Sequence, residues 1–310
     1  MGQHASYDLA NGVYAALATP RRPNSTEINT AALLDYLDAV VGTGVDGLVL
    51  FGATGEFIHF DIEERVHAFN MALRRSRVPV LVNVSHSTLD GAIALAESAI
   101  SSGASGLLLM PPYFYRYTDD EIEHFYTKFA GALEESIPVY LYNLPSFTNP
   151  ISTAVASRLL ADGQFAGIKD SSGNWEMFRT LNQLREHRQF RLLVGNETIY
   201  LKGLMEGADG IVSGIAAACP ELIVAIHRAV KTQQLECARS LNQSLETFLA
   251  WITKFPAGVG LKQAALSRGW GTDQMAIPLP PSDVQQLNEF VEWLKHWMPE
   301  VLRECTTERM

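Results

Sequence analysis

A lysine at the end of a buried apolar segment is the residue of this chain best suited to covalent chemistry. Lys169 closes the run FAGI at 165–168, which has the composition of a strand buried on both faces. An amine there must extend toward solvent or lose its proton readily, because burial disfavours the charged form. A neutral amine can form a Schiff base with a carbonyl compound. A structural ion pair with Asp170 is the alternative, and the sequence leaves both open.

A glycine-rich turn and a tyrosine offer two further chemistries. The sequence GATGE at 52–56 follows an apolar segment, and its glycines allow successive backbone N–H groups to surround a small carboxylate beside the Thr54 hydroxyl. An ordinary glycine turn is the alternative. Tyr142 ends another apolar segment, and its phenol would reach Lys169 from a neighbouring strand to transfer protons. A core tyrosine that bonds to the backbone is the alternative there.

Other catalytic arrangements have little support in the sequence. The eight histidines form no H-E-x-x-H pair, and His59 and His86 are interpreted as polar loop residues, so we expect no metal and no cofactor. No serine lies in a G-x-S-x-G elbow. The sequence GTGVDG at 42–47 matches the dinucleotide fingerprint, but a helix is expected before it and a strand after it, the reverse of what that motif needs.

The segments that must position these residues alternate between short apolar runs and longer stretches of helical periodicity. This alternation predicts a parallel sheet with crossover helices. Helices are predicted at 30–41, 62–75, 89–101, 120–135 and 175–186. Strands are predicted at 13–18, 47–51, 80–84, 106–110, 139–142, 166–169, 191–194 and 210–213.

A repeated glycine pattern indicates how the predicted strands are arranged. GVDGL at 44–48, GASGL at 103–107 and GADGI at 207–211 each have the pattern of a helix C-cap that leads into a strand. Their starts lie 59 and 104 residues apart, which fits two and then four strand-helix units. Eight such units close a (β/α)8 barrel, whose chemistry lies at the C-terminal strand ends. A doubly wound open sheet is the competing fold.

The rest of the chain extends this prediction. Residues 1–220 are expected to form the barrel core, and residues 221–310 the last barrel helix and a C-terminal helical extension, with an amphipathic stretch at 284–298. Basic residues number 24 and acidic ones 34, and the resulting charge of −10 disfavours nucleic acid as a partner.

The cysteines and the apolar runs of the chain predict the compartment in which the protein is located. Three cysteines without C-x-x-C spacing favour a reducing compartment, and no apolar run approaches the ~18 residues of a membrane span. The chain is therefore expected to be cytoplasmic. The sequence MGQHAS at 1–6 fits an acylation pattern that is too short to predict lipidation.

Several motifs in order resemble the dihydrodipicolinate synthase and N-acetylneuraminate lyase family: GATGE, MPPY at 110–113, YNLP at 142–145, GIKD at 167–170, GADG at 207–210 and KQAAL at 262–266. The resemblance covers about residues 12–266 and implies a (β/α)8 TIM barrel in a homotetramer or homodimer. It makes Lys169 the residue that forms a Schiff base with pyruvate or a related 2-oxo acid, and Tyr142 the proton donor and acceptor. It assigns the substrate carboxylate to Thr54 and the amides of Ala53 and Thr54, with Val212 lining the pocket.

Departures from the synthase branch bear on the second substrate. The synthases usually carry a hydroxyl residue at Ala53, a tyrosine at Phe114 and an arginine at Phe147. A phenyl ring cannot grip a carboxylate as arginine does, and Tyr115 is a candidate substitute for the lost hydroxyls. We therefore expect a Schiff-base lyase or aldolase acting on pyruvate or a related 2-oxo acid. The alternatives are a true dihydrodipicolinate synthase, a 2-keto-3-deoxy sugar-acid dehydratase and a non-catalytic 2-oxo acid sensor.

Overall fold

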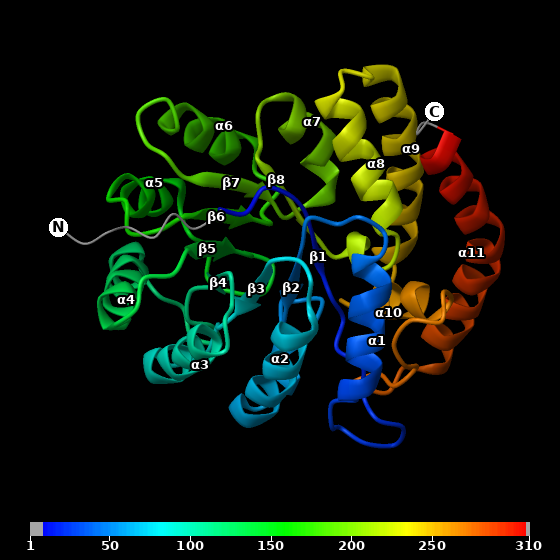
Figure 1. The fold of residues 1–310 in the computed structure, drawn as a ribbon, viewed down its shortest axis with the longest axis horizontal. Helices are drawn as coiled ribbons and strands as arrows, with labels where there is room; N and C mark the ends of the chain where they lie inside the picture. The colour runs from blue at the N-terminus through cyan, green and yellow to red at the C-terminus, as the bar shows by residue number, and fades with distance from the viewer. Residues whose placement is uncertain (1–8, 308–310) are drawn as a thin grey trace. The chain divides into compact units, whose positions relative to one another are not determined.

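The strands of this chain close into a barrel. The computed structural model describes residues 9–307, in which eight parallel strands follow one another around the barrel in chain order (Figure 1). They are β1 (Gly12–Ala16), β2 (Gly47–Leu50), β3 (Val80–Asn83), β4 (Gly106–Leu109), β5 (Val139–Asn143), β6 (Gly167–Asp170), β7 (Arg191–Val194) and β8 (Gly210–Ser213). The predicted (β/α)8 barrel is confirmed, and the closed order excludes an open sheet.

The strand boundaries differ from the prediction by one or two residues. The predicted strand at 47–51 is one residue too long, because Phe51 adopts a left-handed conformation with φ 57° that ends β2. β5 and β6 each extend one residue further than predicted, to Asn143 and Asp170. Gly44, Gly103 and Gly207 have φ of +94°, +85° and +97°, as their predicted place between a helix and a strand requires.

The described residues divide into two compact units. The first unit contains the chain through Gly12 and then Pro79–Ile211, and the second contains Val13–Val78 and the chain from Val212 onward. β1 and β8 therefore each contribute residues to both units. The predicted division at residue 220 falls at the start of α8 (Pro220–Lys231) and stays a prediction.

In the first unit, each helix lies on the outer side of the strand that it follows (Figure 1). Most of these helices begin at a side chain that accepts a hydrogen bond from the first turn, such as Thr118 before α4. Neighbouring helices pack in chain order from α3 to α6. The helices are α3 (Leu89–Ser101), α4 (Asp119–Ala132), α5 (Thr153–Ala161), α6 (Trp175–Leu184) and α7 (Tyr200–Met205).

In the second unit, α11 packs against α8, α9 and α10, and the aromatic side chains Trp251, Phe290 and Trp293 are in contact there (Figure 1). The predicted amphipathic stretch at 284–298 lies within α11. The helices are α1 (Thr30–Val41), α2 (Ile62–Arg75), α8, α9 (Leu235–Ile252), α10 (Val259–Leu266) and α11 (Pro281–Thr307).

Two predicted helix ends are wrong. The helix predicted to reach 135 ends at Ala132, because Leu133 already has an extended backbone with ψ 122°. The helix predicted to reach 186 ends at Leu184. The acylation pattern at 1–6 lies outside the described residues. Within residues 9–307, no helix is long and apolar enough to cross a membrane.

Candidate active site

Lys169 and Tyr142 are brought together in the first unit by strand register. β5 and β6 pair so that Tyr142 lies opposite Lys169, and the Lys169 Nζ lies 3.8 Å from the centre of the Tyr142 ring. Both side chains are buried, with exposed fractions of 4% for Lys169 and 1% for Tyr142. Within residues 9–307, neither the ammonium nor the phenol has a hydrogen-bond or ion-pair partner. Neither group is therefore committed to a partner within the described part of the protein.

The carboxylate beside Lys169 is engaged elsewhere. Asp170 Oδ1 accepts hydrogen bonds from the Asn143 side chain at 2.8 Å and from the Ser172 amide at 3.1 Å, and Oδ2 accepts from the Ser172 hydroxyl at 2.8 Å. Burial raises the pKa of Asp170, and these hydrogen bonds oppose the rise. Successive side chains of a strand point to opposite faces, so Asp170 supports β5 and β6 rather than pairing with Lys169.

A glycine after β7 makes room for the lysine. A Cβ added at Gly195 would lie 2.2 Å from Ser171 Oγ and 3.0 Å from Lys169 Cε. The Gly195 amide also donates to the Asp170 carbonyl at 2.8 Å, which holds this backbone against β6. A side chain at this position would therefore collide with the strand that carries Lys169.

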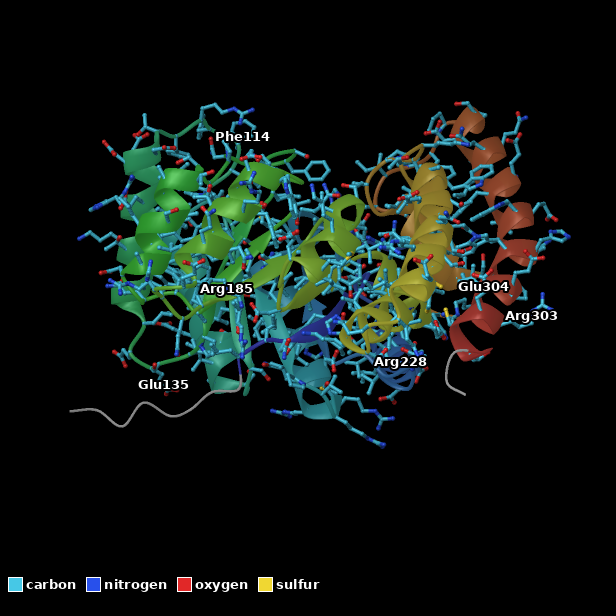
Figure 2. The ribbon with its side chains drawn as sticks, turned by 90° about the horizontal axis from the view of Figure 1, so that it is seen from above. Phe114, Glu135, Arg185, Arg228, Arg303 and Glu304 are labelled. Atoms are coloured by element: carbon cyan, nitrogen blue, oxygen red, sulfur yellow. The ribbon has the colours of Figure 1, made fainter. Side chains whose placement is uncertain are left out.

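A loop after β4 exposes aromatic rings at the same end of the first unit as the C-terminal strand ends. Phe114 has φ 84° and is 87% exposed, and its ring contacts that of Tyr115 at 5.0 Å. Asn149 fixes this loop by donating to the carbonyls of Pro112 and Tyr115, both at 2.7 Å. Figure 2 shows Phe114 and Glu135 at opposite ends of this unit. No hydrogen bond links the Tyr115 hydroxyl to Tyr142 or Lys169 among the described residues.

In the second unit, the turn at 52–56 presents two amides. The Gly55 amide donates to the Gly52 carbonyl and the Glu56 amide to the Ala53 carbonyl, both at 3.1 Å. The amides of Ala53 and Thr54 have no acceptor among residues 9–307. Phe51 precedes the turn and Glu56 ends it, and both are left-handed, with φ of 57° and 53°. A left-handed backbone costs a non-glycine residue ~1–2 kcal/mol. Unused amides in a strained turn are typical of an anion-binding backbone.

The end of β8 lies beside this turn. Gly214 follows β8, and a Cβ added there would lie 2.8 Å from Thr54 Oγ1 and 2.9 Å from Leu261 Cδ1. Val212 is buried within β8. A buried ion pair joins Glu56 to Lys262 on α10. Ala53, Thr54 and Val212 thus belong to the second unit, whereas Lys169 and Tyr142 belong to the first.

Three further features of the described residues are a cavity, an exposed histidine and the distribution of possible metal ligands. A cavity of about 830 Å³ lies at the N-terminal ends of β5, β6 and β7, the end opposite to Lys169, and Glu135, Pro138, Ala166 and Gln189 are among its lining residues. His59 is exposed. In the described part of the chain, no three His, Cys, Asp or Glu side chains are grouped closely enough to hold a metal ion.

The sequence interpretation missed three supporting features of the site. The first is the space that Gly195 leaves for Lys169. The roles of Asn149 in fixing the 112–117 loop and of Lys262 in pairing with Glu56 were also missed. A glycine directly after an apolar segment was the signal available for Gly195, whereas no local pattern marks the other two.

Comparisons with known proteins identify the family of this chain. The model of the dihydrodipicolinate synthetase family matches residues 9–297. A 4-hydroxy-tetrahydrodipicolinate synthase of Salinibacter ruber is 31% identical over 281 residues, 89% of this chain and 91% of that protein. A probable 2-dehydro-3-deoxy-D-pentonate aldolase of Escherichia coli, YjhH, is 30% identical over 224 residues, 70% of this chain and 74% of that protein.

A solved structure shows the same fold. The crystal structure of YagE, a prophage protein from E. coli K12 in complex with pyruvate, superposes with a TM-score of 0.86 at 23% identity. The superposition covers 93% of this chain and 98% of YagE. Because the family model spans most of the chain and its relatives are lyases, the chain belongs to the dihydrodipicolinate synthetase family and is a lyase.

Proposed function

We propose that this lyase forms a Schiff base between Lys169 and pyruvate or a related 2-oxo acid, and makes or breaks a carbon–carbon bond through the resulting enamine. The observation that carries the proposal is the unpaired, buried Lys169 amine beside the Tyr142 ring, fixed by the register of β5 and β6. The motifs around both residues resemble those of the family, and relatives named as an aldolase and a synthase support the same reaction class.

The chemical steps follow from these two side chains. The neutral Lys169 amine attacks the ketone carbon, and the carbonyl oxygen takes up a proton to give a carbinolamine. Tyr142 donates the proton with which the hydroxyl leaves as water, so that a C=N iminium remains. The iminium withdraws electrons, and loss of a proton from the adjacent carbon gives an enamine. That carbon then attacks an aldehyde, or in reverse the bond between them breaks and the aldehyde leaves.

The carboxylate of the 2-oxo acid is assigned to the turn at 52–56. The unused amides of Ala53 and Thr54, together with the Thr54 hydroxyl, supply three donors and no negative charge of their own. Val212 is assigned to the apolar wall of the same pocket. These three assignments rest on the resemblance to the family and on the donors that the turn leaves free.

We propose that the second substrate is not aspartate semialdehyde. Phe147 is 63% exposed and Phe114 is 87% exposed, where the resembling synthases usually carry an arginine and a tyrosine. Neither ring can form the charge-assisted bonds that hold a second carboxylate. A hydroxyaldehyde released from a 2-keto-3-deoxy sugar acid is favoured by the relative named as a pentonate aldolase.

Borohydride trapping tests the Schiff base. Incubation with pyruvate and borohydride should leave a reduced adduct on the peptide that contains Lys169, and Lys169→Met should abolish it. Lys262 is the critical comparison, because burial lowers the pKa of this second buried lysine. An adduct on Lys262 or Lys202, or no adduct at all, would contradict the assignment.

A substrate panel tests the reaction. Cleavage of 2-keto-3-deoxy sugar acids should be measured beside condensation of pyruvate with aspartate semialdehyde, with and without EDTA. Loss of one preorganised charge-assisted contact costs ~2–4 kcal/mol, so semialdehyde condensation should be about 30- to 1000-fold slower than in an authentic synthase. Equal rates would favour the synthase alternative. Loss of water without cleavage would favour the dehydratase. Inhibition by EDTA would favour a metal-dependent aldolase, and adduct trapping without turnover would favour a sensor.

We also propose an oligomeric state and a location for the protein. The resemblance favours a homotetramer or homodimer in the cytoplasm, without a cofactor and without nucleic acid as a partner. Sedimentation of the purified chain measures the oligomeric state directly.

A further inference from the structure

A buried ion pair ties the turn at 52–56 to the C-terminal helices within the second unit. Lys262 on α10 pairs with the Glu56 carboxylate, and their side chains are only 4% and 11% exposed. The two residues are 206 positions apart in the chain. Gly258, which precedes α10 with φ +83°, lies close to the Glu56 side chain. α10 therefore reaches the last residue of the turn with both charge and packing.

Glu56 also controls the direction of the Thr54 amide. The Glu56 amide donates to the Ala53 carbonyl at 3.1 Å. That carbonyl and the Thr54 amide belong to one planar trans peptide, so they point in opposite directions. Fixing the carbonyl toward Glu56 thus fixes the Thr54 N–H on the other side of the turn.

The same geometry applies one residue earlier. The Gly55 amide donates to the Gly52 carbonyl, which lies in the peptide that carries the Ala53 N–H. Thr19, in the segment that follows β1, donates from its Oγ1 to the Gly55 carbonyl at 2.8 Å and holds the turn there. Glu56 is left-handed, with φ 53°, a conformation that needs support from its surroundings. Its buried partner Lys262 supplies that support.

We propose that Lys262 and Glu56 are positioning residues that aim the Ala53 and Thr54 amides at the carboxylate of the 2-oxo acid. This inference rests on the function proposed above, because it concerns the binding step of that reaction. Neither residue touches substrate in this proposal. Loss of the pair should therefore weaken 2-oxo acid binding and leave the chemical step at Lys169 largely intact.

The charges around Glu56 provide a way to distinguish positioning of the amides from simple attraction of the pyruvate anion. Arg21 is also buried in this unit, and its positive charge acts on Lys262, so this group of charges holds two cations and the Glu56 carboxylate. Lys262→Met removes positive charge, whereas Glu56→Gln removes negative charge. If the cluster only attracted anions, the first change would weaken pyruvate binding and the second would strengthen it. Positioning predicts that both changes weaken binding.

The experiment is borohydride trapping at Lys169 as a function of pyruvate concentration in wild type, Lys262→Met, Glu56→Gln and the double variant. The half-saturating pyruvate concentration should rise about 10-fold or more in each single variant, with the saturated trapping rate changed less than about 3-fold. The double variant should be no worse than the worse single one, because both act through one contact.

Glu221→Gln is the matched control. Glu221 forms a comparably enclosed ion pair with Arg268 in the same unit, with side chains 20% and 14% exposed. This variant should change the half-saturating concentration less than about twofold, even where its melting temperature falls as far as that of Lys262→Met.

The outcomes separate this inference from the proposed function. No adduct on wild-type Lys169 would overturn both. A wild-type adduct with an unchanged half-saturating concentration in the variants, or tighter binding in Glu56→Gln, would overturn the positioning role alone. Where Lys262→Met does not fold, Glu56→Gln decides the question, since it keeps the size of the side chain and removes only the negative charge that pairs with Lys262.

Discussion

Gly195→Ala tests whether space beside Lys169 limits the reaction. The added methyl carbon would lie 2.2 Å from Ser171 Oγ, 3.0 Å from Lys169 Cε and 3.1 Å from the Asp170 carbonyl. The serine hydroxyl can rotate away. The carbonyl is part of β6 and cannot, so β6 and the chain after β7 must separate by a few tenths of an ångström.

This displacement acts on the reacting atom, because the Gly195 amide bonds to Asp170, the residue after Lys169. Overpacking of this kind costs ~1–3 kcal/mol of stability. A misplaced reacting group loses up to ~100-fold in rate, and we expect Gly195→Ala to lower the saturated rate of adduct formation by about 10- to 100-fold. The half-saturating pyruvate concentration should change much less, because the carboxylate is assigned to another unit.

The assay is time-resolved borohydride trapping with saturating pyruvate, alongside thermal unfolding. Gly131→Ala is the matched control, since Gly131 lies on α4 in the same unit and an added methyl group there meets nothing within 4 Å. It should keep the wild-type rate and gain up to ~1 kcal/mol of stability. A folded Gly195→Ala variant that forms the adduct at the wild-type rate would refute the argument.

Three further changes test the remaining groups. Tyr142→Phe keeps the ring over Lys169 and should lower kcat by ~10²- to 10⁴-fold with little change in KM, whereas a rise in KM alone would place Tyr142 in binding. Burial raises the pKa of Asp170, so folded stability should fall as pH rises from its ordinary value of 3.8 through the raised pKa. Asp170→Asn should therefore flatten melting temperature plotted against pH, and an unchanged slope would contradict this. Phe147→Arg should raise turnover of aldehydes that carry a carboxylate relative to neutral ones, and an unchanged ratio of kcat/KM would count against a role in selectivity.

The barrel could be predicted from sequence because its signals are local. A strand buried on both faces is a short continuous apolar run, and LLL at 107–109 needs no partner to be recognised. The glycines at 44, 103 and 207 mark the same step between helix and strand three times. Lys169 and Tyr142 could be selected as candidates for the same reason, since each is a polar exception within an apolar run.

The supports of the site could not be predicted because they join distant segments. Glu56 and Lys262 are 206 positions apart, and Asn149 bonds to residues 34 and 37 positions away. Lys262 lies in a short helix of mostly small and apolar residues, and only the folded chain shows that its ammonium meets a buried carboxylate. Phe51 is likewise left-handed, against the local preference of the apolar run that precedes it, and its ring packs against that of Phe60.

The residues assigned to covalent chemistry lie on strands, whereas those assigned to the choice of aldehyde lie on loops. This difference has a consequence for the evolution of substrate choice. Lys169 and Tyr142 lie on adjacent strands, where a shift by one residue would turn each side chain to the opposite face. Phe114 and Phe147 lie on loops and are exposed, so their replacement disturbs no packed core. Covalent chemistry is therefore expected to tolerate few changes at the strand ends, whereas the choice of aldehyde can change by loop substitutions that leave the barrel intact.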